Sequence, residues 1–359
     1  MKIIIAGGGT GGHLFPGIAV AEEFLKRNEK SSILFIGTER GLEKKILPDM
    51  GFDLQTIDVG GIRGKGITKS VCALFKIPWS LAQSFAVIRE FLPDIVIGMG
   101  GYGSGPPLIM AHFMGFKTAI AEQNAIPGLT NRILGRFVDR VFLAFSETRR
   151  WFSEKKVVVT GNPIRKEFLR MKKGREKSGE KFTLLIFGGS QGAHSINRTV
   201  LDSLKYLNGI KDKLKIVHQT GDTDFEWVTE VYADFGMDAD IFPFIDDMAS
   251  AFKSADLLIC RAGATTVAEV TAMGKAAIFV PFPFAAGDHQ AKNAHFLTDA
   301  GAAKMILEKD INGRSLAEAV ERLYRSPRTA IGEMEGESAK LGNIRAAEDI
   351  VKELYQISK

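Results

Sequence analysis

Short apolar runs alternate with amphipathic stretches along the first half of the chain. The spacing of Ile18, Ala21, Phe24 and Leu25 predicts a helix over residues 16–27, and a second helix is expected over 41–50. The apolar runs predict strands at 3–6, 33–36, 95–98, 117–121, 141–144 and 157–160. Strands that are apolar on both faces lie in parallel sheets covered by helices on each side. The first half is therefore predicted to be an α/β domain.

The alternation stops at Gly161-Asn162-Pro163 and then restarts. Residues 171–181 are charged and lack periodicity, so they are expected to form an exposed region between two domains. The later pattern predicts strands at 183–187, 215–219, 241–242, 257–259 and 277–280, and helices at 264–273, 290–300 and 346–355. We expect an N-terminal domain of residues 1–162 and a C-terminal domain of residues 163–359, whose last helix could pack back on the N-terminal domain.

Both halves open with a strand that ends in a glycine-rich turn and restarts as a helix. Residues 3–6 lead into Gly7-Gly8-Gly9-Thr10-Gly11-Gly12-His13, and residues 182–187 lead into the sequence GGSQGA at 188–193. Glycines let the backbone approach a phosphate, and a helix start offers unpaired N–H groups and a positive dipole end. The repetition predicts two Rossmann-like domains that face each other across a cleft, with a phosphorylated ligand between them.

Composition narrows the class of protein. The 359 residues fit two domains of roughly 150 residues each, and 45% apolar and 25% charged residues are ordinary for a globular protein. Two cysteines do not suggest a disulfide framework, and no apolar run approaches the roughly 18–20 residues of a transmembrane helix. The net charge of +5 would suit nucleic acid, an anionic membrane or anionic substrates, and it also occurs without any specific partner.

The first glycine-rich turn is open to two interpretations. Gly7, Gly9 and Gly12 satisfy the G-x-G-x-x-G pattern of nicotinamide oxidoreductases, but Glu39 lies late for the acidic residue that binds the ribose. His13 follows the turn directly, where an imidazole could serve as a general base or contact a phosphate, or be purely structural.

The stretch from Ala262 to Glu269 is more specific. It follows the strand at 257–259 and begins a helix with small and hydroxyl-bearing residues. Glu269 lies about two turns into that helix, which suits ribose hydroxyls while phosphates rest on the helix start. The alternative is a closely packed helix start with a solvated glutamate.

Polar side chains also follow other predicted strands. Glu122-Gln123-Asn124 follows the strand at 117–121, and Gln290, within 282–293, can present both a donor and an acceptor to sugar hydroxyls. Asp222-Thr223-Asp224 resembles a metal-binding acidic pair, but its place in a turn favours an N-cap or a solvated turn. With no His/Cys cluster at ligand spacing, we expect no metal and no cofactor.

Residues 62–79 are the candidate membrane contact. Basic residues are interleaved there with apolar ones, a pattern typical of a monotopic membrane contact or of a core-facing helix with a lysine fringe. The residues are Arg63, Lys65, Lys69 and Lys76, and Ile67, Val71, Leu74, Phe75 and Trp79.

Seven motifs occur in order along nearly the whole chain. They are GGGTGGH at 7–13, GMGGYGSGP at 98–106, EQN-x-x-x-G-x-x-N at 122–131, GNP-x-R at 161–165, GGSQGA at 188–193, FIDDM at 244–248 and RAGATTVAE at 261–269. Together they resemble the MurG family, the N-acetylglucosaminyltransferases that convert lipid I to lipid II in bacterial peptidoglycan synthesis. In that family's pattern a His often precedes the Glu-Gln-Asn run, where this chain has Ala121, and a ring of glutamines near 290 is here reduced to Gln290.

The resemblance implies a type-B glycosyltransferase fold, with UDP-N-acetylglucosamine on the C-terminal domain and a membrane-borne acceptor against the N-terminal one. It implies Thr10, Gly11 and Gly12 as the cleft loop and Asn124 at the donor sugar. The donor-site residues that it implies are Arg165 and Ser190 at the UDP portion, the backbone of Ile245 at the uracil, Ala264, Thr265, Thr266, Val267, Ala268 and Glu269 at the diphosphate and ribose, and Gln290 at the sugar.

The implied reaction is inverting transfer to the C4 hydroxyl of the N-acetylmuramoyl unit of lipid I, with His13 as the preferred base and Glu122 as the second candidate. The resemblance also implies a peripheral protein at the cytoplasmic face of the bacterial inner membrane, with other cell-wall synthesis proteins as further partners and no nucleic acid. The alternatives are a sugar-nucleotide epimerase, a type-B transferase with a soluble acceptor, a nicotinamide oxidoreductase, and a non-catalytic membrane or nucleic-acid binder.

Overall fold

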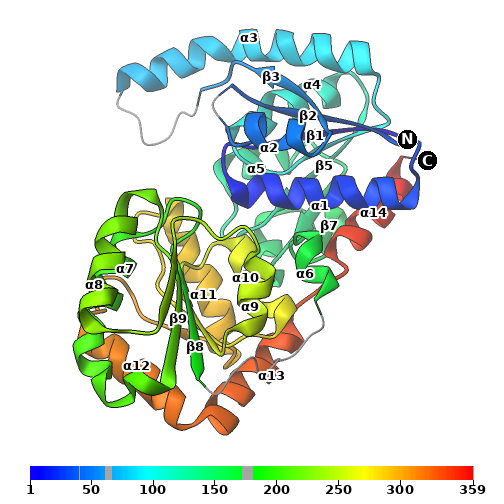
Figure 1. The fold of residues 1–359 in the computed structure, drawn as a ribbon. Coiled ribbons are helices and arrows are strands. Elements are labelled where there is room, and N and C mark those ends of the chain that lie inside the picture. The colour runs from blue at the N-terminus through cyan, green and yellow to red at the C-terminus, as the bar shows by residue number, and fades with distance from the viewer. Residues whose placement is uncertain (40, 61–66, 172–180, 359) are drawn as a thin grey trace. The chain divides into compact units, whose positions relative to one another are not determined.

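The computed structural model describes residues 1–39, 41–60, 67–171 and 181–358. The chain divides into two compact units: Met1–Arg165 with Asn343–Lys359, and Lys166–Gly342. Each unit is built on one parallel sheet, so the predicted class of two Rossmann-like α/β units is confirmed (Figure 1). Apart from its two end residues, the predicted interdomain stretch 171–181 lies outside the described residues.

The first unit contains a seven-stranded sheet in the order β3-β2-β1-β4-β5-β6-β7. Its strands are β1 (Lys2–Ala6), β2 (Ser32–Thr38), β3 (Asp53–Ile57), β4 (Ile95–Gly98), β5 (Lys117–Glu122), β6 (Arg140–Leu143) and β7 (Val157–Val159). The strand order changes direction between β1 and β4, the switch point at which open α/β sheets bind ligands. The loops that follow these two strands are therefore neighbours.

Helices cover both faces of this sheet. Ile3 and Ile5 pack on the side of α1 and α14, whereas Ile4 and Ala6 pack on the side of α3, α4 and α5, because successive side chains of a strand point to opposite faces. The helices are α1 (Gly11–Arg27), α2 (Glu43–Asp49), α3 (Ile67–Phe91), α4 (Gly105–Phe113), α5 (Leu129–Leu134) and α14 (Ala346–Ile357).

The helix α14 belongs to the first unit, where it lies beside α1 (Figure 1). Its apolar residues Ile350, Val351 and Leu354 are buried in the same cluster as the α1 residues that cover the sheet. Asn343, just before the helix, donates a hydrogen bond of 2.7 Å to the Thr160 carbonyl. The second unit thus ends at Gly342, before the end of the predicted domain 163–359, because the amphipathic face of α14 is buried in the first unit.

The second unit contains a six-stranded sheet in the order β10-β9-β8-β11-β12-β13. Its strands are β8 (Phe182–Phe187), β9 (Leu214–Gln219), β10 (Ala239–Phe242), β11 (Leu257–Cys260), β12 (Ala277–Phe279) and β13 (Lys304–Met305). Its helices are α6 (Lys166–Arg170), α7 (His194–Leu207), α8 (Phe225–Phe235), α9 (Met248–Ser254), α10 (Ala264–Met273), α11 (His289–Asp299), α12 (Gly313–Arg325) and α13 (Gly332–Leu341). On one face of this sheet, Leu184 and Ile186 of β8 lie in one apolar cluster with residues of α7, α8 and α12.

Most predicted elements occur within a few residues of their expected ends, and three of the differences have identifiable reasons. The helix α1 begins at Gly11, so the predicted range 16–27 left out its first five residues and placed Pro16 at the helix start instead of in the second turn. The strand β3 was not predicted because it lies at the sheet edge and alternates exposed and half-buried residues. The strand β13 consists of two residues, too short for a pattern.

A buried polar chain joins α7 and α8 to β9. His218 of β9 lies with its Nδ1 2.9 Å from the Tyr232 hydroxyl and its Nε2 3.1 Å from Asn197 Oδ1. Burial lowers the pKa of His218 to about 3 against the opposing influence of Asp224, and it raises that of Tyr232. Both groups are therefore neutral in the folded protein at physiological pH.

This burial predicts a pH-dependent stability. Below pH 6.5 the unfolded chain protonates His218, whereas the folded protein does so only near pH 3. The contribution of this group is complete above pH 6.5 and is lost as the pH falls, at about 1.4 kcal/mol per pH unit.

We expect His218→Gln to flatten the slope of unfolding free energy against pH between about 4.5 and 6 by about that amount. Urea denaturation at several pH values measures the slope, with His289→Gln, a half-buried histidine of the same unit, as the control. Equal slopes for the His218 variant and the wild-type protein would contradict the assignment.

Candidate functional site

In the first unit, the loops after β1 and β4 pack backbone against backbone. A Cβ atom added to Gly7 would come within 2.8 Å of the Gly100 carbonyl oxygen, and one added to Gly101 within 3.2 Å of the Gly8 oxygen. Gly100 and Gly101 also have φ of +93° and +76°, which side chains rarely adopt. Both glycine runs are therefore required by this close approach.

His13 lies in the first turn of α1, against the loop after β4. Its Nδ1 is 3.2 Å from Gln123 Oε1, and a Cβ atom on Gly100 would come within 2.8 Å of the same nitrogen. The preceding Thr10 accepts the backbone N–H of His13 at 3.2 Å and is exposed, as is Gly12, while Gly11 is half-buried. The residues predicted to form the cleft loop thus lead directly into a half-buried histidine at the carboxyl edge of the sheet.

Glu122 has a structural environment. Its buried carboxylate accepts hydrogen bonds from the backbone N–H groups of Asn124 and Gly128, both at 3.0 Å, and from Asn131 Nδ2 at 2.9 Å. These bonds explain the spacing of the EQN-x-x-x-G-x-x-N motif, because its third, seventh and tenth residues all donate to the carboxylate of the first. A proton on Oε1 would compete with the Asn124 N–H, and one on Oε2 with the donors of Gly128 and Asn131, so the geometry favours His13 over Glu122 as a base.

Asn124 and Arg165 also lie in this unit. The Asn124 backbone carbonyl accepts from the Thr148 hydroxyl at 3.3 Å, which holds the loop after β5 in place. The Arg165 guanidinium lies over the ring of Phe15, 5.2 Å from its centroid. The Arg165 side chain therefore packs against α1. Arg165 is also the last residue of the first unit before the chain enters the second unit.

Sequence reasoning missed Glu43, which holds the first glycine turn. Its fully buried carboxylate accepts from the backbone N–H groups of Gly9 and Thr38, both at 2.8 Å. Any Cβ atom at Gly8, Gly37 or Gly41 would collide with this side chain. The spacing of Gly37, Gly41 and Glu43 after an apolar strand was the available signal, and its meaning depends on a contact with a turn far away in the sequence.

In the second unit, Gln219 joins two of the predicted donor-site segments. Its Nε2 donates to the Gly189 carbonyl at 2.8 Å, and its Oε1 accepts the Ile245 N–H at 2.9 Å. Since the amide of Ile245 is engaged in this way, its carbonyl is the backbone group that it could offer to a uracil. Ser190, in the same glycine-rich turn, is exposed.

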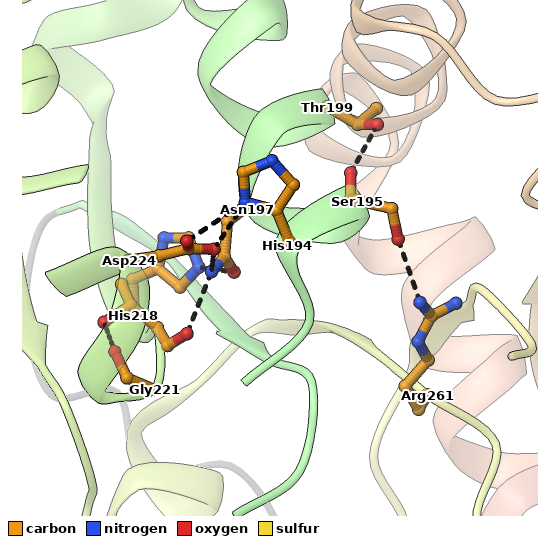
Figure 2. Close-up of polar contacts among 9 residues, drawn as sticks. His194, Ser195, Asn197, Thr199, His218, Gly221, Asp224 and Arg261 are labelled. Atoms are coloured by element: carbon orange, nitrogen blue, oxygen red, sulfur yellow. Dashed lines mark hydrogen bonds and ion pairs between the residues drawn. The ribbon is translucent and has the colours of Figure 1, made fainter. Parts of the chain in front are cut away.

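The first turn of α7 is anchored on two sides. Figure 2 shows His194 and Asn197 directed toward Asp224, and Ser195 directed toward Arg261. Asp224 lies 3.0 Å from His194 Nδ1 and accepts from Asn197 Nδ2 at 2.8 Å, while Arg261 Nη2 donates to the Ser195 hydroxyl at 2.9 Å. The helix that follows the second glycine-rich turn is thus held at the ends of both neighbouring strands.

These contacts correct the expectation for Asp224, whereas Asp222 and Thr223 are exposed, as a solvated turn predicts. Asp224 occupies the N-cap position of α8, but its side chain makes no capping bond and is buried against α7 instead of solvated. The reason is the neighbouring helix start, which offers donors that a sequence pattern does not reveal. Within the described residues, no group of three or more histidine, cysteine or acidic side chains is arranged to hold a metal ion.

The helix α10 has the predicted bounds and carries most of the predicted donor residues. Glu269 is buried in its second turn, Ala264 and Val267 are buried, and Thr266 and Ala268 are half-buried. The Thr265 hydroxyl at the helix start is buried and has no hydrogen-bond partner among the described residues. This places an unsatisfied donor beside the free N–H groups of the helix, an arrangement that suits an anion.

Gln290 fixes the loop before α11. Its Oε1 accepts the Phe282 N–H at 3.0 Å, and its side-chain nitrogen is the group that could reach a sugar hydroxyl. Asn293, one turn further along α11, donates to the Ala262 carbonyl at 3.1 Å. Side chains of α11 therefore bind both the loop before α10 and the loop before α11.

The predicted membrane segment is described only in part. Arg63 and Lys65 lie outside the described residues, and side chains are described from Lys76 onward. Lys76 forms an ion pair with Asp58 at 2.7 Å, and the Trp79 side chain is 61% exposed. In the part of the chain that the structure describes, no helix combines the length and the apolar character needed to cross a membrane.

Comparison with known families covers both units. The family models for the N-terminal and C-terminal domains of glycosyltransferase family 28 match residues 3–143 and 183–354. A transferase from Syntrophus aciditrophicus is 58% identical over 98% of this chain and 97% of its own length, and one from Geotalea uraniireducens is 49% identical over 99% and 98%. Both carry the name UDP-N-acetylglucosamine--N-acetylmuramyl-(pentapeptide) pyrophosphoryl-undecaprenol N-acetylglucosamine transferase.

A solved structure leads to the same family. The crystal structure of Acinetobacter baumannii MurG is similar with a TM-score of 0.81 and 34% identity, covering 99% of each chain. The resemblance predicted from the motifs is confirmed by these relatives, which align over nearly the full length of both chains. The chain belongs to glycosyltransferase family 28 and, within it, to the MurG family.

Proposed function

We propose that this protein transfers N-acetylglucosamine from UDP-N-acetylglucosamine to the C4 hydroxyl of the N-acetylmuramoyl unit of lipid I, giving lipid II with inversion at the anomeric carbon. The observation that carries the proposal is the identity of 58% over nearly the whole chain with a transferase of this name. Epimerisation and transfer to a soluble acceptor are not favoured, because the full-length relatives are named for transfer to the lipid-linked muramoyl acceptor.

The second unit is the proposed donor site. The unsatisfied Thr265 hydroxyl and the N–H groups at the start of α10 suit the diphosphate, and the buried Glu269 suits the ribose hydroxyls. Ser190, the Ile245 carbonyl and Gln290 are the proposed contacts to the remaining parts of UDP and to the sugar. Arg165, with a positive charge, and the helix start would stabilise the departing diphosphate without a metal.

The first unit is the proposed acceptor domain, and His13 is the proposed base. The C4 hydroxyl oxygen forms the new bond to the anomeric carbon while the bond from that carbon to the UDP oxygen breaks, and the hydroxyl proton passes to the imidazole. Thr10, Gly11, Gly12 and Asn124 lie at the same sheet edge as His13 and are proposed to position the sugars.

The reaction itself is tested by incubating the protein with radiolabelled UDP-N-acetylglucosamine and a lipid I analogue, with and without chelator. We expect label in the lipid product at the same rate in both samples, because helix dipoles and Arg165 take the place of a metal. Loss of transfer in the sample with chelator would contradict the prediction of a metal-free site. Tight UDP binding without transfer would indicate a different acceptor.

Two variants should separate chemistry from donor binding. His13→Ala is expected to lower kcat by about 100-fold or more with the KM for the donor unchanged, because the proton acceptor is lost. Glu269→Ala is expected to weaken UDP binding by about tenfold, because a charged group that bonds the ribose is lost. Steady-state kinetics and calorimetric UDP titration measure the two effects. An unchanged kcat would eliminate His13 as the base, and an unchanged UDP affinity would eliminate the ribose contact.

The proposed location is the cytoplasmic face of the bacterial cell membrane, bound through the region near residues 62–79. The exposed Trp79, beside Lys76 on α3, has the amphipathic chemistry of an interfacial anchor. Other cell-wall synthesis proteins remain predicted partners.

Trp79→Ala should lower binding to phosphatidylglycerol vesicles by about tenfold, since burial of an aromatic side chain is lost. Co-sedimentation measures the binding. The matched control is Trp227→Ala, which removes a tryptophan that is 38% exposed in the second unit. Equal binding by the two variants would contradict a contact through α3.

A further inference from the structure

We propose that Gln123 is a positioning residue that holds His13 in the tautomer with its proton on Nδ1, so that Nε2 carries the lone pair. This proposal rests on the proposed role of His13 as the base. It assigns the side chain in the middle of the Glu-Gln-Asn run, whose neighbours Glu122 and Asn124 have other contacts, to the chemistry at His13.

The orientation of the Gln123 amide is fixed by its surroundings. Its nitrogen, Nε2, lies 3.0 Å from the Met99 carbonyl oxygen and 3.3 Å from the Ala121 carbonyl oxygen, and the side chain is buried. Carbonyl oxygens only accept hydrogen bonds, so the NH2 group must face them. The amide oxygen, Oε1, then necessarily points to His13.

That oxygen determines the tautomer of the imidazole. His13 Nδ1 is 3.2 Å from Oε1, and an amide oxygen cannot donate a hydrogen bond. Nδ1 must therefore donate, which requires its proton, and a neutral imidazole with a proton on Nδ1 has its lone pair on Nε2. Two backbone carbonyls at the ends of β4 and β5 thus decide, through one amide, which nitrogen of His13 can accept a proton.

The backbone also confines the ring. A Cβ atom on Gly100 would come within 2.8 Å of Nδ1, and one on Gly101 within 3.5 Å of Cδ2. The glycines allow the loop after β4 to lie flat against the imidazole, which limits the orientations in which the ring can reach another acceptor. The hydrogen bond to Gln123, whose side chain is buried, is therefore made in a confined space.

The chemical consequence concerns the transfer step. When the acceptor hydroxyl loses its proton to Nε2, the imidazole becomes an imidazolium that bears protons on both nitrogens. The Nδ1–H bond to Gln123 is then charge-assisted and stronger, so it stabilises the product of the proton transfer as well as the starting tautomer. The other tautomer would present an N–H group to the hydroxyl and could not remove its proton.

The direct test is nitrogen-15 NMR of protein labelled at histidine, at alkaline pH where imidazoles are neutral. The His13 resonances are those that disappear in His13→Ala. We expect wild-type protein to carry the proton on Nδ1, and Gln123→Met, which removes the acceptor, to show the tautomer with the proton on Nε2 as well. A wild-type proton on Nε2, or a Gln123→Met spectrum equal to wild type, would overturn the proposal.

The matched variant is Gln123→Glu. It keeps an acceptor oxygen for Nδ1 but loses the donor to the Met99 and Ala121 carbonyls, so we expect it to keep the wild-type tautomer. A merely structural role for Gln123 predicts the opposite, because both variants lose those two bonds. Loss of the tautomer in Gln123→Glu to the same degree as in Gln123→Met would overturn the assignment to the acceptor oxygen.

Kinetics supply the second test. Gln123→Met should lower kcat by about 10- to 100-fold, an effect of the size found when the orienting partner of a metal-ligating imidazole is lost, and leave the donor KM unchanged. In a His13→Ala background, Gln123→Met should have no further effect on kcat, because Gln123 acts through His13. An equal loss in both backgrounds would overturn the positioning role. Full activity of His13→Ala alone would contradict the proposed function of His13 as the base. The NMR experiment would then still test whether Gln123 determines the tautomer of His13.

Discussion

The loops at the carboxyl edges of the two sheets contain backbone groups that no strand or helix pairs, and buried polar side chains satisfy them. Glu43 does so for Gly9 of the first turn, and Glu122 for Gly128 of the loop after β5. In the second unit, Gln219 joins two loops through its amide. A buried polar group without a partner is costly, so each of these side chains restricts its loop to few conformations.

The residues that support the loops are different from the residues proposed to contact the substrates. The side chains that hold the loops are buried, whereas Thr10 and Ser190 are exposed and His13 is half-buried. Electrostatic stabilisation of a transition state depends on groups that are already oriented before the substrate arrives. The buried side chains supply that orientation. Their substitution is expected to change the conformation of the loops more than the affinity for a substrate.

The sequence predicted those features of the site that depend on residues close together in the chain. The helix start at Ala264 and both glycine-rich turns follow from composition and from the position of the preceding strand, and the structure has them as predicted. The support from Glu43, and the contact between Asp224 and α7, depend on residues brought together from separate loops. No periodicity encodes such pairs, because each partner alone has the pattern of a surface residue at a helix start.

The order of the segments along the chain has a further consequence. The apolar cluster that covers one face of the first sheet includes Ile350 and Leu354 of α14, yet α14 is synthesised after the whole second unit. Domains generally fold as units, N-terminal first, as they leave the ribosome. Here the first unit cannot complete its apolar cluster until the whole second unit has been synthesised, because α14 follows that unit in the sequence. Until α14 has been synthesised, the surface of α1 that packs against it lacks this partner, although α1 lies near the start of the chain.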